Sequence, residues 1–156
     1  MISAQLLGRV LILENDYCNR ILFADYLEQC GYSVRCLNDE QLSDEQQIFE
    51  SLEAFQPQVL ILNLRMPVID GYTIIEELRN RRQWQHLAIL VVSGYTLVSN
   101  KRRAYQLGAN AYLTKPILPS DLSASVAQLM ATEEKTFPQT PGRGGMTAEV
   151  LNFRPA

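Results

Sequence analysis

Residues 60–71 read Leu60-Ile61-Leu62-Asn63-Leu64-Arg65-Met66-Pro67-Val68-Ile69-Asp70-Gly71, and this stretch decides how the rest of the chain is interpreted. It opens with a short apolar run that ends at a polar residue, Asn63, as a strand buried on both faces does. The Asp70-Gly71 pair further on is typical of a turn that starts a helix. The stretch therefore predicts a buried strand with a polar residue at its carboxyl end, followed by a loop and a helix.

The same alternation of apolar runs and helix-period segments recurs along the chain. Strands are predicted at Val10–Leu13, Tyr32–Cys36, Val59–Leu62, Ala88–Val92 and Ala111–Thr114. Helices are predicted before Gly31, over Leu42–Phe55, over Tyr72–Trp84, over Leu97–Leu107, and from Pro119 onward. Five βα units of this kind predict a parallel sheet covered by helices on both faces.

The length and composition favour one domain with a tail. The chain has 156 residues, of which 47% are apolar and 20% are charged, so a core of ordinary size can form. From Thr132 the sequence becomes rich in Pro and Gly. We therefore expect a domain over residues 1–131 and a flexible tail over residues 132–156.

Charge and cysteine usage narrow the class of protein. The net charge of −3 gives no overall attraction to nucleic acid or acidic membranes, and the two basic groups, Arg79/Arg81/Arg82 and Lys101/Arg102/Arg103, are expected on solvated helix faces. Three cysteines without metal-type spacing argue against disulfides and zinc. No apolar run approaches the roughly 20 residues of a membrane span, and no charged leader precedes a long apolar block. A cytoplasmic protein without nucleic-acid or membrane binding is expected.

Polar residues follow four of the predicted strands. They are Glu14-Asn15, Asn63, Ser93 and Lys115. In an open α/β sheet, ligands and chemistry lie at the carboxyl ends of the strands, so these side chains are the candidate functional site.

The ordered set resembles the response-regulator receiver family, which has an acidic pair after strand one, an acceptor Asp after strand three, a Ser/Thr after strand four and a Lys-Pro after strand five. Further matches are Asn19-Arg20, Met66-Pro67, Asp70-Gly71, Gly108-Ala109 and Tyr112. The resemblance covers about Gly8 to Ala131. It implies an α/β, flavodoxin-like (βα)5 fold with a doubly wound, parallel, five-stranded sheet.

The chain departs from this family at the residues that carry its chemistry. Asn63 stands at the phosphoacceptor position, and an amide cannot form the acyl phosphate that a carboxylate forms. Asn15 stands at the second acidic position, so Glu14 is the single acid of the cluster. Hard divalent cations require several charged oxygens, and we therefore expect weak or absent Mg²⁺ binding, no cofactor and no catalytic residue.

The remaining site positions have alternative interpretations. Lys115, which contacts phosphate in the family, is expected to pair with Glu14 or with the Asn63 carbonyl. Arg65 either folds over the site or is solvated, and Asp16 is expected to cap the first helix. Ser93 and Tyr112 match the family's switch pair; Tyr112 is either a packing aromatic or a retained switch.

Three functions follow from these residues. The favoured one is an atypical receiver of two-component signalling that binds a signalling protein, such as a histidine kinase, another regulator or an output protein, without phosphorylation. The alternative is a phosphorelay receiver that still switches, through Asp16, Asp70 or Ser93, or whose Asn63 replaces a native Asp. The third is a flavodoxin-like small-molecule binder, for which the sequence offers no Gly-rich phosphate loop after strand one. The oligomeric state stays open.

Overall fold

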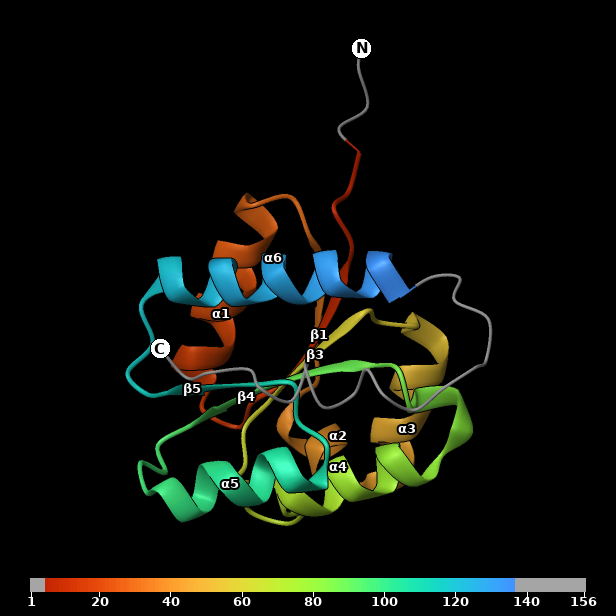
Figure 1. The fold of residues 1–156 in the computed structure, drawn as a ribbon, viewed down its shortest axis with the longest axis vertical. Helices are drawn as coiled ribbons and strands as arrows, with labels where there is room; N and C mark the ends of the chain where they lie inside the picture. The colour runs from red at the N-terminus through yellow and green to blue at the C-terminus, as the bar shows by residue number, and fades with distance from the viewer. Residues whose placement is uncertain (1–4, 137–156) are drawn as a thin grey trace.

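The computed structural model describes residues 5–136, with side chains to residue 132, and its centre is a parallel sheet. In the described residues the five strands are β1 (Arg9–Leu13), β2 (Ser33–Cys36), β3 (Val59–Leu62), β4 (Ala88–Ser93) and β5 (Ala111–Thr114), in the order β2-β1-β3-β4-β5 (Figure 1). All neighbouring strands pair in parallel. The expected flavodoxin-like α/β fold is confirmed, with the order reversing between β1 and β3.

The helices form a layer on each face of the sheet, as Figure 1 shows. They are α1 (Tyr17–Gln29), α2 (Asp39–Leu42), α3 (Glu45–Phe55), α4 (Gly71–Asn80), a 3₁₀ turn η1 (Arg82–Trp84), α5 (Val98–Leu107) and α6 (Pro119–Thr136). α1 and α6 cover one face, and α2 to α5 cover the other. Because β1, β3 and β4 are apolar on both faces, each layer has its own core, and the carboxyl edge of the sheet stays free for polar residues.

The helix expected over Leu42–Phe55 is present but begins three residues later, as α3 over Glu45–Phe55. Leu42 is instead the last residue of a separate short helix, α2, and the chain turns at Ser43 and Asp44. Asn38 caps α2 through a reciprocal capping box with Gln41, and the Asp44 carboxylate accepts the N–H of Gln46 to start α3. Each N-cap therefore starts its own helix, and two residues separate the end of α2 from the start of α3.

The helix expected over Tyr72–Trp84 is also shorter. α4 ends at Asn80, Arg81 is extended, and Arg82–Trp84 form a 3₁₀ turn. The expectation that Arg79 lies on a solvated face is wrong, because its guanidinium donates to the carbonyls of Gly108 at 2.8 Å and Leu87 at 2.8 Å. Burial lowers the pKa of Arg79 to about 10. Arg79 thus fixes the chain reversal after α4 against the turn before β5.

The other boundaries agree with the sequence to within a residue or two, and the last helix continues past the expected domain end at Ala131 to Thr136. The expected tail beyond Thr136 lies outside the described residues. Within the described residues, no helix combines the length and apolarity that crossing a membrane requires.

Replacing Arg79 by Ala should lower the free energy of unfolding by about 3 kcal/mol, because several buried carbonyls lose their donor. Urea denaturation measures the loss. Arg82→Ala, at an exposed position in the same basic group, is the control and should cost less than about 0.5 kcal/mol. Equal losses of unfolding free energy in the two variants would contradict a stabilising role of the Arg79 hydrogen bonds.

Candidate functional site

The candidate site lies at the carboxyl edge of the sheet, where four strands end. Glu14 follows β1, Asn63 follows β3, Ser93 is the last residue of β4, and Lys115 follows β5. The parallel register of these neighbouring strands places their ends side by side. The structure brings Glu14, Asn63 and Lys115 into direct contact, and Ser93 contacts Tyr95 in the adjoining loop.

Glu14 is the centre of the contact network, and its side chain has 0% exposure. Its Oε2 lies 2.7 Å from the Lys115 ammonium, so the structure has Glu14 as the partner of Lys115, one of the two expected from the sequence. Its Oε1 accepts from the Asp16 backbone N–H at 3.0 Å and from the Asn63 side-chain amide at 3.2 Å. A buried carboxylate is costly unless it is paired and hydrogen-bonded. Here Oε1 accepts two hydrogen bonds, and Oε2 has the Lys115 ammonium as its ion-pair partner without a hydrogen bond of regular geometry.

Asn63 is 5% exposed and donates its side-chain amide to three oxygens. Nδ2 lies 2.6 Å from Asn15 Oδ1, 2.9 Å from the Arg65 carbonyl and 3.2 Å from Glu14 Oε1. An amide nitrogen is a donor, so it satisfies acceptors that a cation would otherwise bring together. The two asparagines therefore bond to each other, a contact that the sequence analysis did not predict.

The donor set does not fit Mg²⁺. The one carboxylate, Glu14, is already neutralised by Lys115, and the oxygen of Asn15 accepts from Asn63. Mg²⁺ is bound by carboxylates in near-octahedral geometry, and a single engaged carboxylate with amide and backbone oxygens is a poor substitute. Among the described residues, no group of three or more His, Cys, Asp or Glu side chains is arranged to hold a metal ion.

The two aspartates next to the site serve helix starts. Asp16 caps α1 by accepting the Asn19 N–H at 2.9 Å, as expected, and Asp70 caps α4 by accepting the Tyr72 N–H at 3.1 Å. Arg65 is exposed, which agrees with the solvated alternative, and it contributes its backbone carbonyl to the site. Arg20, which the sequence analysis gave no role, donates to the Glu14 carbonyl at 3.1 Å and pairs with Asp39.

Ser93 and Tyr112 both bond to Tyr95, a residue that the sequence analysis missed. The buried Ser93 hydroxyl accepts the Tyr95 N–H at 3.1 Å, and the Tyr112 hydroxyl donates to the Tyr95 carbonyl at 2.8 Å. Tyr112 is only 9% exposed, so its ring is turned inward. Burial raises the pKa of the Tyr112 hydroxyl, and a hydrogen bond with Ser93 opposes that increase. Both switch positions thus hold the loop after β4.

The fold and this edge of polar residues define a signalling module of the doubly wound α/β class. The family model described as "Response regulator receiver domain" matches residues 10–127, and the chain belongs to this family. Receiver domains act in two-component signalling, where they interact with histidine kinases and with output or regulator proteins.

Similar proteins support the assignment. RcaC of Microchaete diplosiphon is 30% identical over 116 residues, which are 74% of this chain and 17% of that protein. The DNA-binding transcriptional regulator RpaA of Synechocystis is 27% identical and covers 94% of this chain, which spans 57% of RpaA. A crystal structure described as a response regulator from Chloroflexus aurantiacus superposes with a TM-score of 0.72, at 27% identity, over 80% of this chain and 98% of the other. The chain therefore spans just over half of RpaA and a small part of RcaC.

Replacing Lys115 by Met should lower the free energy of unfolding at pH 7 by about 3 kcal/mol, because the buried Glu14 carboxylate loses its counterion. The double variant Glu14→Gln/Lys115→Met should recover most of that loss, since no unpaired charge remains. Urea denaturation compares the two. If the double variant is as unstable as the single one, charge pairing is not the reason for the loss.

Replacing Tyr112 by Phe should cost about 1 kcal/mol at neutral pH through the lost bond to Tyr95. It should also weaken the alkaline loss of stability. The folded-state pKa of Tyr112 is raised above the ordinary value of 10.0, so stability is present below pH 10 and is lost as the pH rises above it. Thermal melts from pH 7 to 11 test this; Tyr17→Phe, at an exposed position, should cost less than about 0.5 kcal/mol at neutral pH.

Proposed function

We propose that this chain is an atypical receiver domain that works as a protein-interaction module without phosphorylation. The observation that carries the proposal is the Asn63 amide, which donates to Asn15, Arg65 and Glu14 at the position of the family's acceptor carboxylate. An amide offers no nucleophilic oxygen to a phosphoryl group. The domain is in this proposal not an enzyme, and no catalytic residue is assigned.

The electrostatic balance of the site supports the same conclusion. Phosphoryl transfer needs a cation to neutralise developing negative charge. Here Glu14 and Lys115 neutralise each other at 2.7 Å, so the lysine is engaged in a structural ion pair. The site is stable as it stands and does not depend on Mg²⁺ or phosphate.

The inward position of Tyr112 supports a fixed output state. In the family this aromatic turns inward when the hydroxyl after strand four grasps phosphate. In this chain the ring is already buried, and its hydroxyl is bonded to Tyr95. Tyr72 adds a bond of 3.3 Å from its hydroxyl to the Asn100 carbonyl in α5, with the Arg103 guanidinium 4.1 Å from its ring centroid. We propose that these contacts hold α5 in one position.

The proposed partner is a signalling protein that binds the surface of α5, β5 and α6. α5 carries Lys101, Arg102 and Arg103 and no acidic residue, and the neighbouring Leu97 and Val98 are 66% and 69% exposed. A surface of this kind fits a partner that offers carboxylates around an apolar side chain.

The alternative, a receiver that is phosphorylated elsewhere, is less well supported. Asp16 and Asp70 both accept a backbone N–H as helix caps, and Ser93 is buried with its hydroxyl engaged. Using any of them as the acceptor would first require these bonds to break. The remaining version, in which Asn63 stands in place of a native Asp, is tested directly by substitution.

The deciding experiment is a titration of Mg²⁺ with beryllofluoride, followed by amide NMR shifts at Asn63, Ser93, Tyr112 and Lys115. The chain as it stands should show no saturable shifts at about millimolar ligand, because its donor set is neutral. The variant Asn15→Asp/Asn63→Asp gives the cluster three carboxylates. It should bind Mg²⁺ and respond to beryllofluoride, and it should be less stable than the parent when Mg²⁺ is removed by EDTA.

Saturable shifts in the unaltered chain would contradict the proposal and revive phosphate-dependent switching. The single variant Asn63→Asp shows whether position 63 alone has been changed or the whole metal site has been lost. A full response in the single variant would favour the first explanation, in which Asn63 replaces a native Asp in an otherwise working receiver. A response only in the double variant would favour a site that has lost metal binding as a whole.

A further inference from the structure

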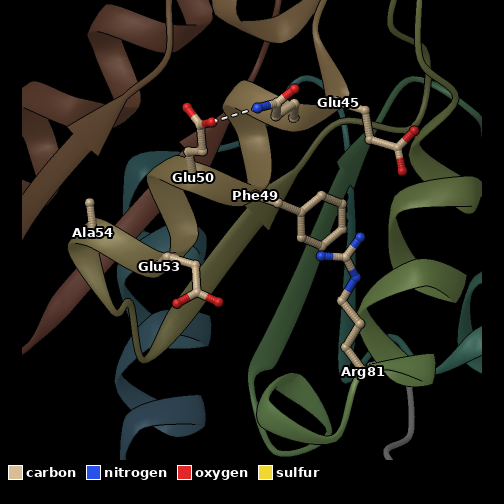
Figure 2. A pocket seen from close by; sticks show the side chains of 7 residues that line it. Glu45, Phe49, Glu50, Glu53, Ala54 and Arg81 are labelled. Atoms are coloured by element: carbon tan, nitrogen blue, oxygen red, sulfur yellow. Dashed lines mark hydrogen bonds between the residues drawn. The ribbon is translucent and has the colours of Figure 1, made fainter.

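An open groove lies between α3 and the segment that follows α4. Its lining residues are Glu45, Gln46, Phe49, Glu50, Glu53, Ala54 and Arg81. The Arg81 guanidinium lies 3.6 Å from the centroid of the Phe49 ring, and Figure 2 shows the two side chains facing each other, with the labelled carboxylates around them. The groove is therefore lined by two apolar residues, Phe49 and Ala54, among charged and polar ones.

The lining is acidic because its carboxylates are not neutralised. Glu50 accepts from Gln46 at 2.9 Å and Glu53 accepts from Gln83, so both bond to neutral amides. Arg81 is the one cation among the lining residues, and its nearest carboxylate partner is Glu77 at 4.0 Å. The surrounding chain adds to the imbalance: from Cys36 to Leu64 there are six acidic residues and no Lys or Arg.

The opposite charge lies on α5. Lys101, Arg102 and Arg103 follow one another in this helix, which has no acidic residue. In the described part of the chain, the ion pairs with carboxylates involve Arg20, Arg81 and Lys115 and none of these three. The start of α5 also presents two exposed apolar side chains, those of the N-cap residue Leu97 and the first helical residue Val98. A cationic helix with an apolar end is what the acidic groove is suited to accept.

A symmetric contact between two α5 helices is disfavoured by the same charges. A twofold axis through α5 would place three cations against three identical cations. A head-to-tail contact, in which α5 of one molecule meets α3 of the next, pairs opposite charges instead.

We propose that a second copy of this chain occupies the groove, with its α5 cations facing Glu45, Glu50 and Glu53 and its Leu97 and Val98 against Phe49 and Ala54. Both surfaces lie on the face of the sheet that α2 to α5 cover, and α4 lies between them (Figure 1). Such a contact is heterologous, so it produces chains or rings of molecules and no fixed dimer. It goes beyond the proposed function and would also cover the α5 surface that a partner needs.

Sedimentation velocity of the full chain tests the proposal over about 10–500 µM protein. In about 50 mM salt the sedimentation coefficient should rise with concentration, and in about 500 mM salt the rise should vanish, because exposed charge pairs are screened. Glu50→Gln/Glu53→Gln removes two carboxylates while keeping side-chain shape, and should weaken association about five-fold.

A sharper test reverses the charges of the groove in one variant and those of α5 in another. Glu50→Lys/Glu53→Lys and Arg102→Glu/Arg103→Glu should each remain monomeric, and an equimolar mixture of the two should associate again. The control is Asp25→Lys/Glu28→Lys on α1, which makes the same change of charge on the other face of the sheet and should associate like the parent.

Three results would overturn the proposal. They are a monomeric parent chain at the highest concentration in low salt, a mixture of exchanged variants that stays monomeric, and a control variant that loses association as fully as the groove variants. None of them bears on Asn63 or on the response to beryllofluoride, so this inference and the proposed function can fail separately.

Discussion

The buried carboxylate of Glu14 is the constraint on which the carboxyl edge of the sheet depends. An anion with no exposed surface must find donors inside the protein, and it finds them on separate strands. Lys115 comes from the end of β5, Asn63 from the end of β3, and the Asp16 N–H from the loop after β1. These contacts fix the relative positions of three strand ends and of the loops that follow them.

The number of carboxylates then decides what the site can do. One carboxylate and one ammonium are balanced, whereas three carboxylates around the same lysine would require a dication. The amide of Asn63 completes the balance by donating to the oxygens around it. The loop after β4 is held by Ser93 and Tyr112, which bond to the backbone N–H and the backbone carbonyl of Tyr95.

The sequence predicted the strands well because each is a short apolar run bounded by polar residues or turn residues. β3 and β5 agree to the residue, and Glu14 was one of the two partners expected for Lys115. The missed features depend on contacts between residues far apart in the chain or on competing caps. Arg79 reaches Gly108, 29 positions away, and the division of α2 from α3 depends on whether Asp44 caps or continues a helix. Local periodicity contains neither kind of information.

In the proposed function, recognition depends on the outer helices and not on a change of charge at the site. A working receiver controls its surface by changing the charge in its pocket, but here the pocket is neutral and the net charges lie on α3 and α5. Charges on exposed helices act on association rate and partner choice, and in the proposed function they do so without phosphorylation of the site. A domain that works as proposed is regulated by the molecules that bind its surfaces. Under the two proposals, a signalling partner and a second copy of this chain compete for α5, and their concentrations decide which one binds.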